Sequence, residues 1–257
     1  MQAACGSAVH VPSITIMYRR LLTPFRHSSI VYPMSFFPIN LNMAGRMVTV
    51  VGGGKIAERK TCKLLEAGAL ITMIAPDLSD KLAKLSEGGS IKHLPRNFKK
   101  GDLDGAFLAI AATSDRYANL AVADEAKNRG ILVDVCDDPE LSSFIMPAMM
   151  TRGDLVIAVS TGGKSPAMAK KIREQLEASF GPEYEQTLKL LGILREKLLT
   201  AKGNSAYNKA LLSQLAAHDL PRMIKERRYD QLDHLLLKIF GSEFSISHLL
   251  EEEKDHQ

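Results

Sequence analysis

Apolar residues between positions 47 and 135 alternate between short runs and longer stretches with one apolar face. Short runs rich in β-branched residues are typical of buried strands. They cover residues 47–51, 69–75, 107–112 and 131–135. The stretches between them predict helices over residues 57–67, 78–86 and 117–129. Because strands that alternate with helices form parallel sheets with crossover connections, this region is predicted to be an α/β domain.

The spacing changes after Pro139. Apolar runs at 144–150 and 155–160 flank a turn-like segment at 151–154, which predicts a pair of strands in a smaller region. Residues 165–179 predict a helix, because Ser165 can cap it and Pro166 suits its first position.

Leucines at helical spacing dominate the chain from Pro182 onward. They predict a bundle of short helices with breaks near Gly203, Pro221 and Gly241. The acidic end from Glu251 is expected to be frayed.

Composition narrows the class of protein. The chain has 33 basic and 29 acidic residues and a net charge of +4, so its overall field does not indicate a nucleic-acid partner. No apolar run approaches the roughly 18–20 residues that span a bilayer, so this chain is not expected to be a membrane protein. Cys5, Cys62 and Cys136 lie far apart and form no CxxC pair, which indicates neither a disulfide framework nor a metal cage. A reducing compartment, the cytoplasm, fits best.

The opening segment is basic, because the first acidic residue is Glu58. A start of this kind is compatible with a transit peptide or a tail. We favour a third interpretation, in which residues 1–33 are an upstream extension of the reading frame and Met34 is the functional start.

A glycine-rich turn follows the first predicted strand and fits the pattern G-x-G-x-x-A: Gly52-Gly53-Gly54-Lys55-Ile56-Ala57. In this pattern the first glycine permits a tight turn, the second lets the backbone approach a pyrophosphate, and the last residue lets helix and strand pack closely. The amide groups and dipole of the following helix favour phosphate binding. The turn therefore predicts a dinucleotide site at the start of a Rossmann-like sheet.

The choice of dinucleotide depends on the residues that follow the second strand. An acidic residue about 20 positions after the glycines holds the ribose hydroxyls in NAD enzymes, and Asp77 is the candidate. No arginine pair stands beside it to receive a 2′-phosphate, although Lys81 is near. The sequence favours NAD over NADP.

Polar residues follow the last two strands of the predicted sheet, where ligands collect in parallel sheets. They are Thr113, Ser114, Asp115, Asp134, Asp137 and Asp138. Asp138 precedes a proline and is explained as a turn former. Asp137 is therefore the preferred general base.

Four segments, in order and with the expected spacing, resemble the precorrin-2 dehydrogenase and sirohydrochlorin ferrochelatase family, which includes the N-terminal part of siroheme synthase. The resemblance runs from about Met34 to Leu199. Besides the glycine-rich segment 50–60, it rests on residues 108–113, 143–148 and 160–166.

The resemblance implies NAD-dependent oxidation of precorrin-2 to sirohydrochlorin by a homodimer. It implies an NAD-binding Rossmann domain over 34–140, a small α+β dimerisation and substrate region over 141–180, and a helical C-terminal region over 181–257. Asp137 matches the family's active-site aspartate, implicated in dehydrogenation and in iron insertion. The cofactor contacts fall on Gly52, Gly54, Lys55, Ile56, Pro76, Asp77 and Thr113.

The same resemblance suggests substrate contacts at Thr161, Lys164 and Arg152, since the tetrapyrrole is a polycarboxylate that basic groups can pair with. Thr161 departs from the serine of many bacterial relatives. Lys170 and Lys171 are better explained as a solvated helix face. The methionines at 146, 149 and 150 are more often core residues than the lining of a ring slot.

Several alternatives stay open. Some members of the family insert Fe²⁺, yet the seven histidines form no close-spaced pair that indicates a metal site. Another NAD-dependent oxidoreductase, or a non-catalytic NAD-sensing module, would use the same fold. The C-terminal helices either cap the substrate cleft or dock a partner.

Overall fold

The computed structural model describes residues 36–200 and 205–245. Chain contacts separate Met1–Phe37 from Pro38–Gln257, and the fold below belongs to the second unit. The expected extension 1–33 with its start at Met34, the expected break at Gly203 and the acidic end from Glu251 lie outside the described residues.

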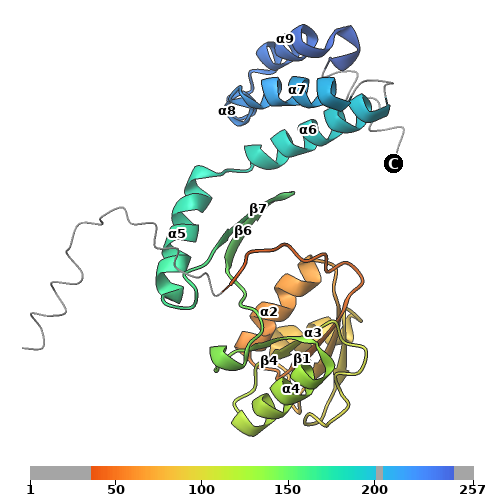
Figure 1. Ribbon diagram of the computed structural model, residues 1–257, viewed down its shortest axis with the longest axis vertical. Coiled ribbons are helices and arrows are strands. Elements are labelled where there is room, and N and C mark those ends of the chain that lie inside the picture. The colour runs from red at the N-terminus through yellow and green to blue at the C-terminus, as the bar shows by residue number, and fades with distance from the viewer. Residues whose placement is uncertain (1–35, 201–204, 246–257) are drawn as a thin grey trace, which may run out of the picture. The chain divides into compact units, whose positions relative to one another are not determined.

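A five-stranded parallel sheet forms the first part of this unit (Figure 1). The strand order is β3-β2-β1-β4-β5, so β1 lies at the centre. The strands are β1 Met47–Val51, β2 Leu70–Ile74, β3 Ile91–Leu94, β4 Leu108–Ala111 and β5 Leu132–Val135. All four neighbouring pairs are parallel. The predicted α/β architecture is confirmed.

Helices cover the sheet through two apolar clusters. The helices are α2 Lys55–Glu66, α3 Asp80–Glu87 and α4 Arg116–Arg129. Leu64 and Leu82, from α2 and α3, belong to one cluster, and Val122 of α4 belongs to the other. Within β1, Val50 belongs to the first cluster and Val51 to the second, because successive side chains of a strand point to opposite faces. Both faces of the sheet are therefore buried.

One strand was missed by the sequence pattern. β3 (Ile91–Leu94) lies at the edge of the sheet, and only Ile91 is fully buried. An edge strand tolerates polar residues such as Lys92 and His93, so its sequence lacks the apolar run that predicted the other strands.

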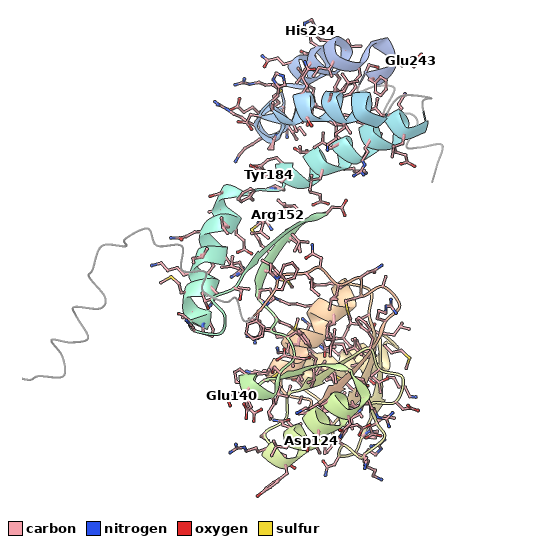
Figure 2. The ribbon with its side chains drawn as sticks, viewed as in Figure 1. Asp124, Glu140, Arg152, Tyr184, His234 and Glu243 are labelled. Atoms are coloured by element: carbon pink, nitrogen blue, oxygen red, sulfur yellow. The ribbon has the colours of Figure 1, made fainter. Side chains whose placement is uncertain are left out.

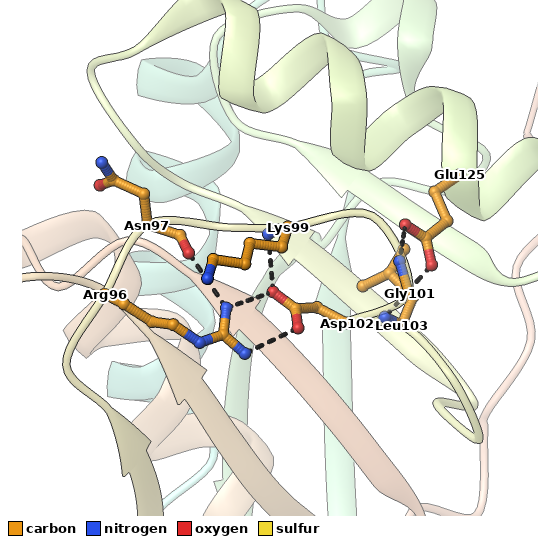
Figure 3. Close-up of polar contacts among 7 residues, drawn as sticks. All are labelled: Arg96, Asn97, Lys99, Gly101, Asp102, Leu103 and Glu125. Atoms are coloured by element: carbon orange, nitrogen blue, oxygen red, sulfur yellow. Dashed lines mark hydrogen bonds and ion pairs between the residues drawn. The ribbon is translucent and has the colours of Figure 1, made fainter.

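A loop at 95–107, rather than a helix, connects β3 to β4 (Figure 3). Leu103 inserts into the cluster under α4 and is fully buried. Asp102 accepts two hydrogen bonds from the Arg96 guanidinium, at 2.7 and 2.8 Å, and a third from the backbone amide of Lys99. Glu125 of α4 accepts from the amide of Gly101 at 2.9 Å. Two carboxylates thus anchor the loop.

We expect Asp102→Asn to lower the free energy of unfolding at pH 7 by about 1 kcal/mol or less, since a charge-assisted pair is lost but solvent screens it on the exposed side of Arg96. The hydrogen bonds from Arg96 lower the pKa of the Asp102 carboxyl. A lowered folded-state pKa means that the stabilisation is present above the unfolded-state value of about 3.9 and is lost as pH falls through the folded-state value. Urea unfolding should show a constant difference from pH 7 to 5 that narrows below about pH 4. A difference independent of pH would contradict this account.

An antiparallel hairpin follows the sheet, with strands β6 Ala148–Arg152 and β7 Leu155–Val159. The predicted pair of strands is confirmed, but its limits were wrong. Residues 144–147 form no strand: Pro147 has no amide to donate, while Phe144 and Met146 pack against the sheet. The turn is also shorter than predicted, because Thr151 and Arg152 belong to β6.

The predicted helix after the hairpin is confirmed as α5 Pro166–Ser179. The Ser165 hydroxyl accepts a hydrogen bond from the amide of Met168 at 3.2 Å, as an N-cap. α5 contacts both strands of the hairpin.

The C-terminal helices are α6 Glu183–Thr200, α7 Ser205–Ala216, α8 Leu220–Lys225 and α9 Tyr229–Phe240. They share an apolar cluster that includes Leu194, Leu215 and Leu236. α9 ends at Gly241 as predicted. The break predicted near Pro221 is also confirmed, because α7 ends at Ala216 and α8 begins at Leu220. Pro221 itself lies in the first turn of α8, where its missing amide costs nothing. Among the described residues, no helix is both long and apolar enough to cross a membrane.

Candidate active site

The glycine-rich turn between β1 and α2 passes close to the end of β4. Gly52 has φ +115°, and its amide donates to the carbonyl of Ile74 at 2.9 Å. A Cβ on Gly52 would lie 2.3 Å from the carbonyl oxygen of Ala112 and 3.0 Å from the amide nitrogen of Thr113. This position therefore requires glycine, and it places the turn against the loop that follows β4.

Gly53 and Gly54 meet different surroundings. A Cβ on Gly53 would lie 1.9 Å from the carbonyl oxygen of Asp77, so this glycine lets the turn contact the end of β2. A Cβ on Gly54 would meet no atom of residues 36–200 and 205–245 within 4 Å. Gly54 is the N-cap of α2 and provides no side-chain cap. The first turn of α2 therefore presents its amide groups beside open space, an arrangement suited to phosphate oxygens.

Gly54→Ala is expected to weaken NAD binding at least about tenfold while the melting temperature stays unchanged. The protein leaves space for the methyl group, and the backbone of Gly54, at φ −83° and ψ −175°, is open to alanine. The methyl group would fill the space that a pyrophosphate needs. Calorimetric titration with NAD checks this, with Gly192→Ala in α6 as the control, because a Cβ there also meets nothing. Equal NAD affinity in the two variants would contradict a pyrophosphate site at Gly54.

The other residues expected to contact the cofactor surround this turn. Lys55 and Ile56 open α2 and are exposed, with half of the Ile56 side chain accessible. Pro76 and Asp77 follow β2 and are also exposed. The contact between Gly53 and Asp77 brings the two groups together, and the amide of Ser79 donates to the carbonyl of Gly53 at 2.8 Å.

Thr113 opens the loop between β4 and α4. Its hydroxyl accepts from the amide of Asp115 at 2.7 Å and donates to the carbonyl of the same residue at 3.0 Å. The Asp115 carboxylate in turn caps α4 by accepting from the amides of Tyr117 and Ala118. The loop is therefore fixed at the carboxyl end of β4.

Asp137 lies just past β5, and its side chain is exposed. Its Oδ1 accepts a hydrogen bond at 2.9 Å from the side-chain amide of Asn119, a residue only 1% exposed. Asn119 is a residue that the sequence analysis missed. The feature that could have identified it is a polar side chain at a position of α4 that is buried against the sheet. Asp138 caps the 3-10 turn Pro139–Leu141 through the amide of Glu140, so its role as a turn former is confirmed.

Asp134 differs from the other carboxylates expected at this edge. It lies within β5, is 6% exposed, and forms an ion pair with Lys60 of α2. Asp134 is therefore a buried structural group rather than a loop residue.

Cys136 lies two residues after Asp134, just past β5. Burial raises the pKa of its thiol to about 11, so that thiol is protonated at neutral pH.

The structure separates the three residues expected to contact the substrate. Thr161 and Lys164 lie between β7 and α5, where the Thr161 hydroxyl accepts from the amide of Ser165 at 3.1 Å and Lys164 is exposed. Arg152 ends β6 beside Leu155, at the other end of β7, a strand that is about 13 Å long by its rise per residue. Its guanidinium donates to the carbonyls of Phe180 and Thr151 (Arg152 is labelled in Figure 2). The Phe180 ring contacts that of Tyr184 at the start of α6, with the ring centroids 4.8 Å apart. Arg152 therefore joins the hairpin to the end of α5.

The lysines and methionines that were weighed as substrate contacts lie where a solvated helix face and a core would place them. Lys170 and Lys171 are exposed on α5, and Met146 and Met150 pack as core residues. Within residues 36–200 and 205–245, no three His, Cys, Asp or Glu side chains gather as they would around a metal ion.

Two family models match consecutive parts of the chain. A putative NAD(P)-binding model matches residues 39–148, and a model of the central region of sirohaem biosynthesis proteins matches residues 152–179. The first match covers the sheet and the segment that leads to the first residue of β6, and the second covers the last residue of β6, β7 and α5.

Curated and solved relatives agree with these matches. The siroheme synthase of Chromobacterium violaceum is 46% identical over 151 residues, which are 59% of this chain and 32% of the relative. Siroheme synthase 3 of Aeromonas hydrophila is 41% identical over 165 residues, 64% of this chain and 35% of the relative. The chain thus spans about a third of the length of these relatives. A solved structure, SirC, a precorrin-2 dehydrogenase, is 28% identical with a TM-score of 0.67, covering 80% of this chain and all of SirC. Over residues 39–179 the chain is therefore similar to NAD(P)-binding and sirohaem biosynthesis proteins, among them siroheme synthases and a precorrin-2 dehydrogenase.

Proposed function

We propose that this protein is an NAD-dependent dehydrogenase that oxidises precorrin-2 to sirohydrochlorin in siroheme biosynthesis. One observation carries the proposal: the open space at Gly54 and the carboxylate of Asp137 lie at the carboxyl edge of one sheet and are linked by contacts. The turn at Gly52 lies against Thr113, and Asn119 joins the Thr113 loop to Asp137. The similarity to siroheme synthases and to a precorrin-2 dehydrogenase supports this function over an NAD sensor or an unrelated oxidoreductase.

The residues around the glycine-rich turn fit a dinucleotide. The amide groups of the first turn of α2 face the space at Gly54 and are proposed to hold the pyrophosphate. Asp77 follows β2, where a carboxylate accepts hydrogen bonds from both ribose hydroxyls and repels a 2′-phosphate. This charge supports NAD as the cofactor, with Lys55, Ile56, Pro76 and Thr113 as further contacts.

Bound NAD would supply a hydride acceptor for the reduced tetrapyrrole. The protein must then remove a proton from the same substrate, and Asp137 is proposed as the base. Because Oδ1 of Asp137 is held by Asn119, its Oδ2 is the oxygen proposed to receive the proton. For iron insertion, which the family resemblance implies for some members, Asp137 is proposed to accept the pyrrole protons.

The region after the sheet is proposed to bind the substrate and a second copy of the chain. Lys164 and Thr161 precede α5, where an exposed ammonium and a hydroxyl suit a substrate carboxylate. The two-stranded sheet of β6 and β7 exposes Val156, and an isolated hairpin of this kind is marginal without further packing. These features support a homodimer with substrate and dimer contacts over 141–180, between the NAD-binding domain at 34–140 and the helices of 181–257. The free thiols Cys62 and Cys136 support a cytoplasmic location.

An anaerobic absorbance assay with enzymatically generated precorrin-2 tests the proposal. Conversion to sirohydrochlorin is expected with NAD, more slowly with NADP, and not without a cofactor. A second step adds Fe²⁺ or Co²⁺, and loss of the sirohydrochlorin spectrum above the rate without protein would establish iron insertion. NAD binding without any change in precorrin-2 would refute the dehydrogenase.

A further inference from the structure

The side-chain amide of Asn119 connects two loops that leave neighbouring strands. Its Oδ1 accepts from the backbone amide of Thr113 at 3.3 Å, and its Nδ2 donates to the carbonyl of Thr113 at 3.0 Å. The same Nδ2 donates to Oδ1 of Asp137 at 2.9 Å. With 1% of the residue exposed, water does not replace these partners.

We propose that Asn119 is a positioning residue that holds the base Asp137 in a fixed orientation relative to the cofactor loop at Thr113. The inference rests on the proposed dehydrogenase function. A primary amide is the side chain that suits the position, because it supplies two N–H donors and a carbonyl acceptor from one planar group. Aspartate lacks the donors, and leucine lacks all three groups.

A purely structural role for Asn119 would require fewer hydrogen bonds than its side chain makes. Its two bonds to Thr113 are enough to close the loop between β4 and the first turn of α4. The third bond adds nothing to that loop and reaches a carboxylate 18 residues further along the chain, on an exposed side chain. A single hydrogen bond from a buried amide therefore restricts an otherwise exposed carboxylate. In the part of the chain that the structure describes, Oδ2 of Asp137 has no hydrogen-bond partner and is available to a proton.

The position of Asn119 also fixes the distance between the base and the cofactor contacts. Thr113 lies against Gly52 of the glycine-rich turn, so the amide links the turn, the β4 loop and Asp137 into one set of contacts. A reaction that passes a hydride to the cofactor and a proton to a base needs both acceptors placed against one substrate. Small displacements of a reacting group lower rates strongly.

The test is a double-mutant cycle on kcat with Asn119→Ser, Asp137→Ala and the double variant, in the anaerobic assay with NAD. We expect Asn119→Ser to lower kcat by roughly 10- to 100-fold with a smaller change in the KM for precorrin-2. In the Asp137→Ala background the same substitution should lower kcat less than about threefold, because its effect passes through Asp137. Asn119→Asp, which keeps the side-chain size but removes both donors, should repeat the result if Asn119→Ser folds poorly.

Glu125→Gln is the matched control, since Glu125 is a buried polar residue of the same helix that anchors loop 95–107 instead. It should lower the melting temperature and leave kcat unchanged. If wild type is active and losses multiply in the double variant, the positioning role is overturned while the dehydrogenase stands. If wild type leaves precorrin-2 unchanged, the dehydrogenase and the positioning role are overturned together.

Discussion

Replacing Asp137 by asparagine is expected to lower kcat for precorrin-2 oxidation by roughly 10²- to 10⁴-fold, the range for loss of a general base. Asparagine has the same shape and keeps an oxygen that accepts the hydrogen bond from Asn119, but it does not take up a proton. Because Asp137 is exposed and outside the apolar clusters, the melting temperature should not change. NAD affinity should also be unchanged. Steady-state kinetics, calorimetric titration and thermal unfolding of one preparation measure all three.

Asp138→Asn is the control for this prediction. Asp138 is the next residue, and its carboxylate caps a 3-10 turn, a role that asparagine fills equally well. Its kcat should match that of the wild type. Comparable activity in the Asp137 and Asp138 variants would remove Asp137 from the reaction.

Breaking the ion pair between Lys60 and Asp134 should produce the largest loss of stability. Both side chains are nearly buried, with exposures of 12% and 9%. Asp134→Asn leaves the Lys60 ammonium without its counter-ion, and the loss of one member of a buried pair costs about 3–5 kcal/mol. That is a large share of the roughly 5–15 kcal/mol that holds a protein folded. Chemical denaturation measures the change in the free energy of unfolding.

The double variant Lys60→Met with Asp134→Leu distinguishes two free energies: the cost of leaving one buried charge unpaired, and the net stabilisation by the intact ion pair. Apolar residues of similar volume often replace a buried ion pair without loss, so most of the stability should return. Glu174→Gln, which removes the pairs of an exposed carboxylate with Lys170 and Arg173, should change stability by less than about 1 kcal/mol. A single variant as stable as the wild type, or a double variant as unstable as the single one, would contradict this account.

The cofactor turn was predictable because its signal is local. Gly52, Gly54 and Ala57 stand within six positions, directly between a strand and a helix that their own patterns predict. The need for glycine at position 53 was not predictable from the pattern. It arises from the nearby carbonyl oxygen of Asp77, a contact that only the folded chain creates.

The contacts that organise Asp137 were not predictable from spacing. Asn119 meets Asp137 across 18 residues, and Lys60 meets Asp134 across 74. No periodicity relates such positions, since their proximity follows from the order of β1, β4 and β5 in the sheet. The sequence pattern predicted parallel pairing without that order. It therefore singled out Asp137 as a candidate base but predicted neither its hydrogen bond with Asn119 nor the ion pair between Lys60 and Asp134.

The apolar pattern also failed where tertiary packing replaced regular structure. Phe144 and Met146 continue an apolar run that resembles a strand, yet they pack against the sheet from an irregular segment. Leu103 covers the sheet from a loop in the place where a helix usually crosses. In both segments apolar side chains pack against the sheet without regular secondary structure.

The central claim is tested most directly by counting products. The purified protein is incubated anaerobically with precorrin-2 and excess NAD, and NADH and sirohydrochlorin are quantified in the same sample. Our account predicts that the two products appear in equal amounts in the wild type, and that both are nearly absent in Asp137→Asn although NAD still binds. Sirohydrochlorin formed without NADH, or NAD bound with precorrin-2 left unchanged, would contradict it.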